Sequence, residues 1–131
     1  MAIEFVAGPN VEGLAISEAV RADGFVFLSG LAGFGPDGEI ISGGVVAETD
    51  RIMLDLKDIL ARAGLRLSDV VRVSVHLRSA TDLDAFNDAY AKYFPKSKPA
   101  RIATVAGLLH GGLLELEVIA HGPKPAQQEE K

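Results

Sequence analysis

The chain has 131 residues, 48% of them hydrophobic, with 18 acidic against 13 basic side chains and a net charge of -5. This length fits one globular domain that buries about two-thirds of the surface of its unfolded chain. The acidic balance and the scattered basic residues argue against a nucleic-acid or anionic-membrane partner, and the lack of cysteine excludes disulfides and thiolate chemistry.

The two ends of the chain predict where the domain lies. The start, MAIEFVAGPN, has no basic stretch leading into an apolar run, so it is not typical of a signal peptide. No apolar segment approaches the length of a membrane span. We therefore expect a cytoplasmic protein with a single domain over residues 1–122 and a polar, disordered tail over residues 123–131.

The first half of the chain predicts three strands and a helix. A short strand over residues 3–6 precedes a hairpin whose turn is Ala22-Asp23-Gly24. Residues 25–28 are continuously apolar, which predicts a strand buried on both faces, and the Gly-rich segment 34–44 predicts a loop. From about residue 46 the spacing becomes helical, with Gly64 at the C-cap position; the apolar positions are Ile52, Leu56, Ile59, Leu60 and Ala63.

The second half predicts a strand, a helix and a final strand pair. Residues 68–78 alternate strictly, with Val71, Val73, Val75 and Leu77 on one side. Thr81 and Asp84 resemble a capping box in front of a second helix that Pro95 ends. The last two strands, 101–105 and 113–120, are predicted to be neighbours joined by a Gly-rich connection that contains His110.

The element order β-β-β-α-β-α-β-β predicts an α+β domain with one sheet and two helices on one of its faces. In the last strand Leu114, Leu116, Val118 and Ala120 form an apolar face, and Glu115 and Glu117 lie on the other face between Leu113 and Ile119. Ser74 and His76 add polar groups to that second face. Polar and apolar residues mixed in this way are typical of a semi-buried subunit interface, so we expect an oligomer.

The strongest chemical pair in the sequence is Arg101, which ends the segment PAR (99–101), with Glu115 in LELE (114–117). A guanidinium is suited to a substrate carboxylate, and a carboxylate in a partly apolar site can hold or activate water. If the last two strands are adjacent, the two side chains can share a site. On spacing alone the residues favour an exposed arginine and solvated glutamates, and they leave the shared site open as the alternative.

Other candidates for chemistry are weaker. His76, His110 and His121 lack the spacing of a zinc site, and His110 in a Gly-rich loop favours a solvated histidine over an acid or base. Neither Ser17 nor Ser29 lies in a nucleophile motif, and no G-x-G-x-x-G follows a strand. We therefore expect no metal and no cofactor.

Seven segments in order resemble the Rid family of reactive-intermediate deaminases, the YjgF-like proteins. They are ISEAV (16–20), FVFLSG (25–30), LKDILARAG (56–64), SDVVRVSVHL (68–77), FNDAYAKYFP (86–95), PAR (99–101) and LELEVIA (114–120). The resemblance implies a chorismate-mutase-like fold with a single mixed sheet, assembled as a homotrimer with active sites between subunits. It also implies hydrolysis of 2-imino or 2-enamino acids to 2-keto acids and ammonia, with a small carboxylate as substrate and no cofactor.

The resemblance also implies roles for individual residues. Arg101 matches the arginine that grips the substrate carboxylate, Glu115 matches the glutamate that holds the attacking water, and Gly30 and Asn87 match positions that line the cleft. Glu117 is then structural. The resemblance therefore implies that Glu115, and not Glu117, belongs to the site.

The chain departs from the family pattern at the predicted pocket. Ile16 replaces a tyrosine and is followed by Ser17 and Glu18, Leu31 replaces a glutamine, and Ala103 replaces a cysteine. The connection between Arg101 and Glu115 is one residue shorter than in the family pattern. We expect Ile16 and Ala103 to contact the substrate in a more apolar pocket that takes a bulkier imine, or a ring-cleavage enamine such as an aminomuconate.

Two other functions remain open at this point. Loss of the tyrosine position favours a non-catalytic trimeric module that binds small carboxylates for regulation. Endoribonuclease activity is a label sometimes attached to this family, but the acidic chain has no basic strip interleaved with aromatic residues for a single strand.

Overall fold

The computed structural model describes residues 2–124, which form one sheet with two helices packed against it. Most of the predicted tail, residues 123–131, lies outside the described residues. The strands are β1 (Ile3–Val6), β2 (Ala19–Ala22), β3 (Phe25–Leu28), β4 (Val70–Leu77), β5 (Ala100–Val105) and β6 (Leu114–His121). The helices are α1 (Gly44–Arg62) and α2 (Leu83–Ala91), and short 3-10 turns cover Pro9–Val11, Leu67–Asp69 and Ala80–Asp82.

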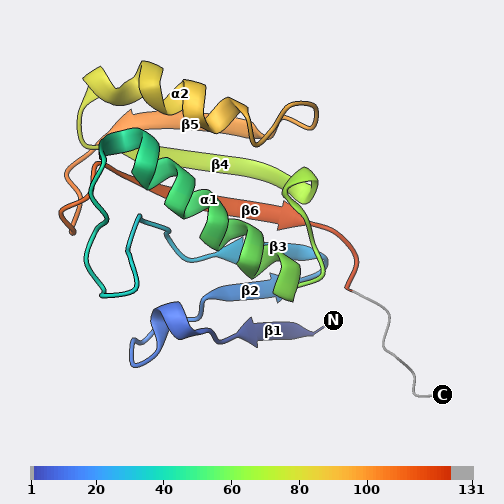
Figure 1. The fold of residues 1–131 in the computed structure, drawn as a ribbon. Helices are drawn as coiled ribbons and strands as arrows, with labels where there is room; N and C mark the ends of the chain where they lie inside the picture. The colour runs from blue at the N-terminus through green and yellow to red at the C-terminus, as the bar shows by residue number, and fades with distance from the viewer. Residues whose placement is uncertain (1, 125–131) are drawn as a thin grey trace.

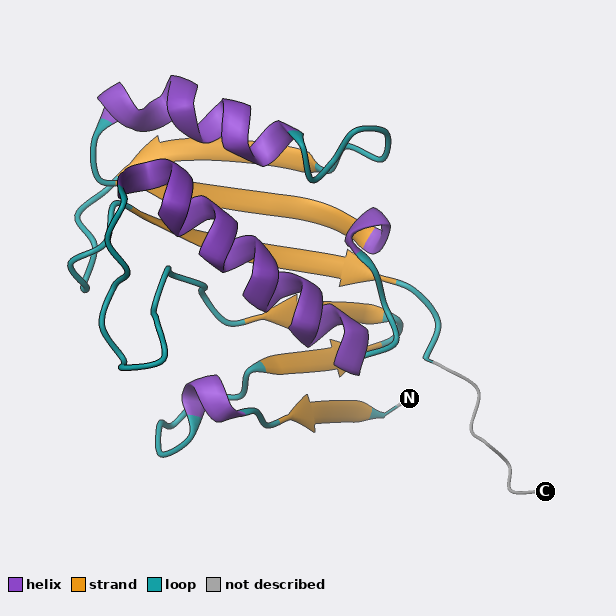
Figure 2. Cartoon of the chain, in the orientation of Figure 1, coloured by secondary structure: helices purple, strands orange, loops and turns teal. Residues whose placement is uncertain are grey.

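The sheet is mixed, with the strand order β1-β2-β3-β6-β4-β5. β4 and β5 run parallel, and the other neighbouring strands pair antiparallel. The element order and the single mixed sheet confirm the predicted α+β architecture. Both helices cover the same face of the sheet (Figures 1 and 2): α1 crosses obliquely in front of β6, and α2 lies along β5.

The core lies between the sheet and α1. The predicted apolar stripe of α1 is buried there, including Ile52, Leu56 and Leu60, opposite the predicted apolar face of β6. A helix with one apolar stripe and a sheet with one apolar face bury the most surface when these two surfaces meet. The opposite face of the sheet, which we call the open face, is covered by no helix within residues 2–124.

The β2–β3 hairpin is confirmed, but β3 is not buried on both faces. Asp23 and Gly24 take positive φ angles of 54° and 85°, as a two-residue turn of a right-twisted hairpin requires. Val26 is fully buried, whereas Phe25 and Phe27 stay 41% and 43% exposed. The prediction was wrong because helices cover only one face of the sheet, so alternate side chains of β3 point to the open face.

β4 corrects the strict alternation predicted for residues 68–78. The pairing with β6 shifts register between Val70 and Arg72, as in a β-bulge. Val70 is therefore buried and Val71 is exposed, whereas Val73 and Val75 follow the expected pattern. A bulge inserts one extra residue into a strand and moves the side chains before it to the other face.

The start of α2 corrects the predicted capping box. Ser79, not Thr81, supplies the capping oxygen, and it accepts a hydrogen bond from the Thr81 backbone N–H at 3.2 Å. That bond caps the 3-10 turn that precedes α2, and the α2 N-cap residue Asp82 makes no side-chain cap. The helix then ends at Ala91, before Pro95.

The last two strands are not neighbours, which corrects a second prediction. β4, α2 and β5 form a crossover unit that places β5 parallel to β4 at the edge of the sheet. β6 pairs with the other side of β4, so β4 separates β5 from β6. A short connection between β5 and β6 had suggested a hairpin, but the parallel crossover already occupies that position.

Candidate active site

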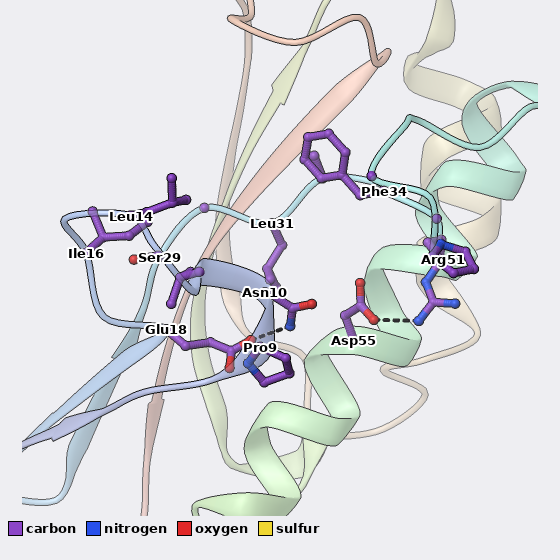
Figure 3. A pocket seen from close by; sticks show the side chains of 16 residues that line it. Pro9, Asn10, Leu14, Ile16, Glu18, Ser29, Leu31, Phe34, Arg51 and Asp55 are labelled. Carbon is purple, nitrogen blue, oxygen red and sulfur yellow. Dashed lines mark hydrogen bonds and ion pairs between the residues drawn. The ribbon is translucent and has the colours of Figure 1, made fainter.

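A cavity of about 610 Å³ opens beside α1 and contains two of the predicted site residues, Ile16 and Gly30. We call it the first cavity. Figure 3 shows Leu14 and Ile16 entering it from the loop before β2, Leu31 and Phe34 from the segment after β3, and a polar wall on α1. The lining is mostly apolar where the predicted substrate contacts lie.

The polar wall of the first cavity consists of groups that are already paired. Arg51 and Asp55 form an ion pair on α1 with an N–O distance of 2.5 Å. Glu18 is buried, pairs with Arg62 at 3.2 Å, and accepts a hydrogen bond from Asn10 (Figure 3). Glu18 therefore connects the N-terminal loop to α1 through Asn10 and Arg62, and its role is structural.

Glu115 lies on the open face of β6, directly against Gly30. Leu31 and Leu116 exchange two backbone hydrogen bonds, of 2.8 and 2.9 Å, and these fix the segment after β3 onto β6. A side chain at position 30 would collide with the Glu115 carboxylate, so only glycine leaves room for this contact. His110 approaches the same carboxylate, with Nε2 3.5 Å from Oε1 of Glu115.

Arg101 and Asn87 lie in a second cavity of about 330 Å³, between α2 and the start of β5. The Arg101 guanidinium lies over two aromatic rings of α2, with Cζ 5.0 Å from the Tyr90 centroid and 5.5 Å from that of Phe86. Within residues 2–124, Arg101 forms no salt bridge. Its donors are therefore free for a ligand while the rings hold its plane.

Two buried polar atoms add to the second cavity. Asn87 Oδ1 and the Tyr90 hydroxyl are buried and have no hydrogen-bond partner in the described part of the chain. Burial raises the pKa of Tyr90 to about 12, and the nearby charge of Arg101 opposes that rise. Tyr90 therefore keeps its proton at neutral pH and can donate a hydrogen bond. Buried polar groups without partners are costly unless a ligand or water satisfies them.

The two groups of site residues lie on opposite faces of the sheet in one chain. Arg101 pairs in register with Val73, whose side chain is in the core under the helices. Glu115 pairs with His76, and both lie on the open face. Side chains in register on neighbouring strands share a face, so the sheet separates the guanidinium from the carboxylate. A single chain does not bring the predicted pair together.

Ala103 shares the face and strand of Arg101, in register with Val75, and it is exposed outside both cavities. Sequence reasoning missed Tyr90 as a site residue. Phe86 and Tyr90 lie four residues apart on α2, and Phe94 follows the helix after four more residues, a spacing that is typical of a packing stripe. The aromatic face that supports Arg101 is one surface of that stripe.

Two further properties concern the described residues as a whole. Between residues 2 and 124, no group of three or more His, Cys, Asp or Glu side chains is arranged to hold a metal ion. None of the described helices is both long and apolar enough to cross a membrane.

The fold is the chorismate-mutase-like α+β class, and comparison with known proteins identifies the family. The family model described as Endoribonuclease L-PSP matches residues 14–122. The chain belongs to this family, the Rid or YjgF-like proteins. The match confirms the family resemblance of the seven short segments.

The relatives include proteins named as deaminases. The chain is 41% identical over 110 residues to the 2-iminobutanoate/2-iminopropanoate deaminase of Capra hircus, which covers 82% of this chain and 80% of that protein. The human protein of the same name is 36% identical over 110 residues, covering 82% and 80%. The crystal structure of yeast Mmf1 superposes with a TM-score of 0.85 at 32% identity, covering 93% of this chain and 100% of that one. Imine deaminases are therefore among the members of the family.

Proposed function

We propose that this protein hydrolyses 2-imino or 2-enamino acids to 2-keto acids and ammonia, with Arg101 and Glu115 as catalytic residues. The observation that carries the proposal is the second cavity. In this cavity the Arg101 guanidinium, which has no ion-pair partner in the described residues, lies over the rings of Phe86 and Tyr90. The amide of Asn87 and the hydroxyl of Tyr90 line the same cavity. This is a donor-rich site for a small carboxylate. Deaminases of 2-imino acids among the relatives support the reaction.

The active site would form between two copies of the chain. Arg101 and Glu115 lie on opposite faces of one sheet, so they can act together only if Arg101 of one copy meets Glu115 of another. β5 is an edge strand, and its position at the rim of the sheet leaves Arg101 accessible to a second subunit. The homotrimer implied by the family resemblance is the assembly we propose, with one site at each subunit contact.

The chemistry needs few groups because an iminium carbon is already electrophilic. Arg101 would fix the substrate carboxylate, and Glu115 would hold a water against C2 of the imine. The water oxygen bonds to C2, the C=N electron pair moves to nitrogen, and Glu115 takes a proton from the water. That proton passes to the nitrogen. The C–N bond then breaks, its electron pair leaves with ammonia, and the hydroxyl oxygen forms the keto group as Glu115 takes the hydroxyl proton. Glu115 releases this proton to ammonia or solvent, which returns the carboxylate to its starting state.

The first cavity supports a substrate with an apolar side chain. Leu14, Ile16, Leu31 and Phe34 present aliphatic and aromatic surface next to Gly30 and hence next to Glu115. We propose that imino acids with branched or aromatic side chains are preferred over imino acids with small side chains. An aminomuconate has a second carboxylate, and Arg51 is already paired with Asp55, so we rank it below an apolar imine.

The test is ammonia release from 2-imino acids made in place by an amino-acid oxidase, over small, branched and aromatic side chains and 2-aminomuconate. Arg101→Ala and Glu115→Gln should each reduce turnover by at least about a hundredfold. Arg66→Ala and Glu39→Gln are the matched controls, because Arg66 and Glu39 are exposed outside both cavities. The controls should keep the wild-type rate.

The same experiment separates the non-catalytic alternative. Calorimetric binding of a 2-keto acid that Arg101→Ala abolishes, without turnover of any imine by the wild type, would replace the enzyme by a carboxylate-binding module. Turnover that survives both substitutions would contradict the assigned catalytic residues.

A further inference from the structure

His110 is held in one orientation by the loop that precedes β6. The Gly112 backbone N–H donates to Nδ1 of His110 at 3.0 Å, so Nδ1 carries no proton. The neutral ring therefore carries its proton on Nε2. The ring packs edge-on against Phe34, with centroids 5.7 Å apart and planes at 73°. This geometry places an N–H group 3.5 Å from Oε1 of Glu115.

The loop itself is fastened from two other elements. Arg78, which follows β4, donates through Nε to the Gly112 carbonyl at 2.8 Å and through Nη2 to the His110 carbonyl. Glu48 of α1 is buried and accepts the Leu113 backbone N–H at 2.7 Å. A side chain at position 112 would contact both Glu48 and the His110 ring, so the glycine allows the close fit. The imidazole is therefore fixed before any substrate binds.

The Nε2 atom of His110 is the only polar ring atom of this histidine without a hydrogen bond to the described residues. It is buried, and its contact with Glu115 lies in ion-pair range but outside hydrogen-bond geometry. A movement of about 0.5 Å by the carboxylate would complete the bond. A buried donor left unpaired costs free energy, so it favours a Glu115 rotamer that accepts from it.

A second histidine–glutamate contact on the open face gives a comparison. His76 Nε2 lies 3.5 Å from Oε1 of Glu117, the same separation as in the His110–Glu115 contact. The side chains of His76 and Glu117 are 32% and 62% exposed, against 15% and 35% for His110 and Glu115. Within one chain the His110 contact is therefore the more shielded of the two, and its partner is the proposed catalytic carboxylate.

We propose that His110 is a positioning residue for Glu115. Its Nε2–H holds Oε1, which leaves Oε2, on the Gly30 side, to bind the attacking water. This inference rests on the proposed function for its effect on rate, but the contact itself is a property of the free protein. The loop between β5 and β6, which is one residue shorter than in the family pattern, would then serve to hold His110 next to Glu115.

The test uses two replacements that each keep one half of the imidazole. The amide oxygen of His110→Asn replaces Nδ1 as acceptor for Gly112 but does not reach Glu115. The amide nitrogen of His110→Gln takes the place of Nε2–H. We expect kcat to fall on the order of tenfold to a hundredfold in His110→Asn, with KM and thermal midpoint unchanged, and to recover most of that loss in His110→Gln. Arg66→Ala, at an exposed residue outside both cavities, is the control and should keep the wild-type kcat.

A second readout needs no turnover. The ¹³C shift of the Glu115 carboxyl, assigned by its loss in Glu115→Gln, should change in His110→Asn and return toward wild type in His110→Gln. An unchanged shift in His110→Asn would overturn the inference, whether or not the wild type hydrolyses imines. A changed shift with unchanged kcat in an active enzyme would overturn the positioning role. An inactive wild type with the expected shifts would instead remove the proposed function and keep the contact.

Discussion

At the scale of single residues, the environment of the two tyrosines shifts their pKa values. Burial raises the pKa of Tyr90 to about 12. Burial, the 2.6 Å hydrogen bond to Asp50 and the charge of Asp50 together raise the pKa of Tyr93 to about 12. The chain has two tyrosines and no tryptophan, so absorbance at the tyrosinate band reports these two groups alone.

We therefore predict that both tyrosines of the folded protein titrate near pH 12 instead of 10.0. The sign for stability follows, because the unfolded chain loses these protons at lower pH than the folded one. The free energy of unfolding should be constant with respect to these groups below pH 10.0 and fall as the pH rises toward 12. A spectrophotometric titration with a midpoint at the ordinary value would show that the rings are not buried as described.

The residues of the candidate site could be proposed from sequence, and their roles stay a prediction, but their grouping could not be predicted. The segment PAR and the strand LELE identified Arg101 and Glu115, and Gly30 was found through the family pattern. The placement of Arg101 near Glu115 failed because it assumed that β5 and β6 are adjacent. His110 was predicted to be solvated, and the structure shows it largely buried, because Arg78 and Glu48 hold its loop against the sheet. Those contacts join residues far apart in the sequence.

At the scale of elements, the β2–β3 turn depends on a residue without a side chain. Gly24 has a φ of 85°, and a Cβ at this position would lie 3.1 Å from Nε2 of His121 on β6. We predict that Gly24→Ala lowers the free energy of unfolding by about 1–2 kcal/mol, because a side chain disfavours the left-handed conformation.

Urea denaturation measures this change, and Gly107→Ala is the control. Gly107 has no positive φ and nothing within 4 Å of an added Cβ. The control should change the free energy of unfolding by less than about 0.5 kcal/mol. Equal effects of the two substitutions would mean that the turn conformation does not limit stability.

Element types were predictable because periodicity and turn residues are local. The stripe of α1 and the alternation of β6 were sufficient to assign them. The bulge at Val70 and the Ser79 cap were not predictable, because each depends on backbone pairing that the spacing of residue types does not specify. The burial of β3 depends on which faces of the sheet the helices cover, and the sequence of the strand alone does not show this.

At the scale of the whole molecule, the open face is the feature that one chain leaves incomplete. Phe25 and Phe27 of β3 and Ile102 of β5 are large apolar residues that are exposed on the open face. Apolar residues gathered on one face of a protein mark interaction sites more often than solvated surfaces. The proposed trimer would cover them.

We predict that Ile102→Glu shifts the protein toward single chains in light scattering, because a buried, unpaired carboxylate opposes association. Leu54→Glu is the matched control. Leu54 is comparably exposed but lies on α1, which covers the other face of the sheet. If Ile102→Glu left the mass unchanged, the open face would not be the subunit contact.

The central claim is that each active site takes Arg101 from one copy and Glu115 from another, and subunit mixing tests it most directly. Chains carrying Arg101→Ala and chains carrying Glu115→Gln are each inactive in this account, because every site lacks one group. Co-assembled one to one, they should regain about a quarter of the wild-type activity per site, since random neighbours restore both groups in that fraction of contacts. Mixtures of Arg101→Ala with the double variant should stay inactive. A one-to-one mixture as inactive as its two components would contradict a site shared between subunits.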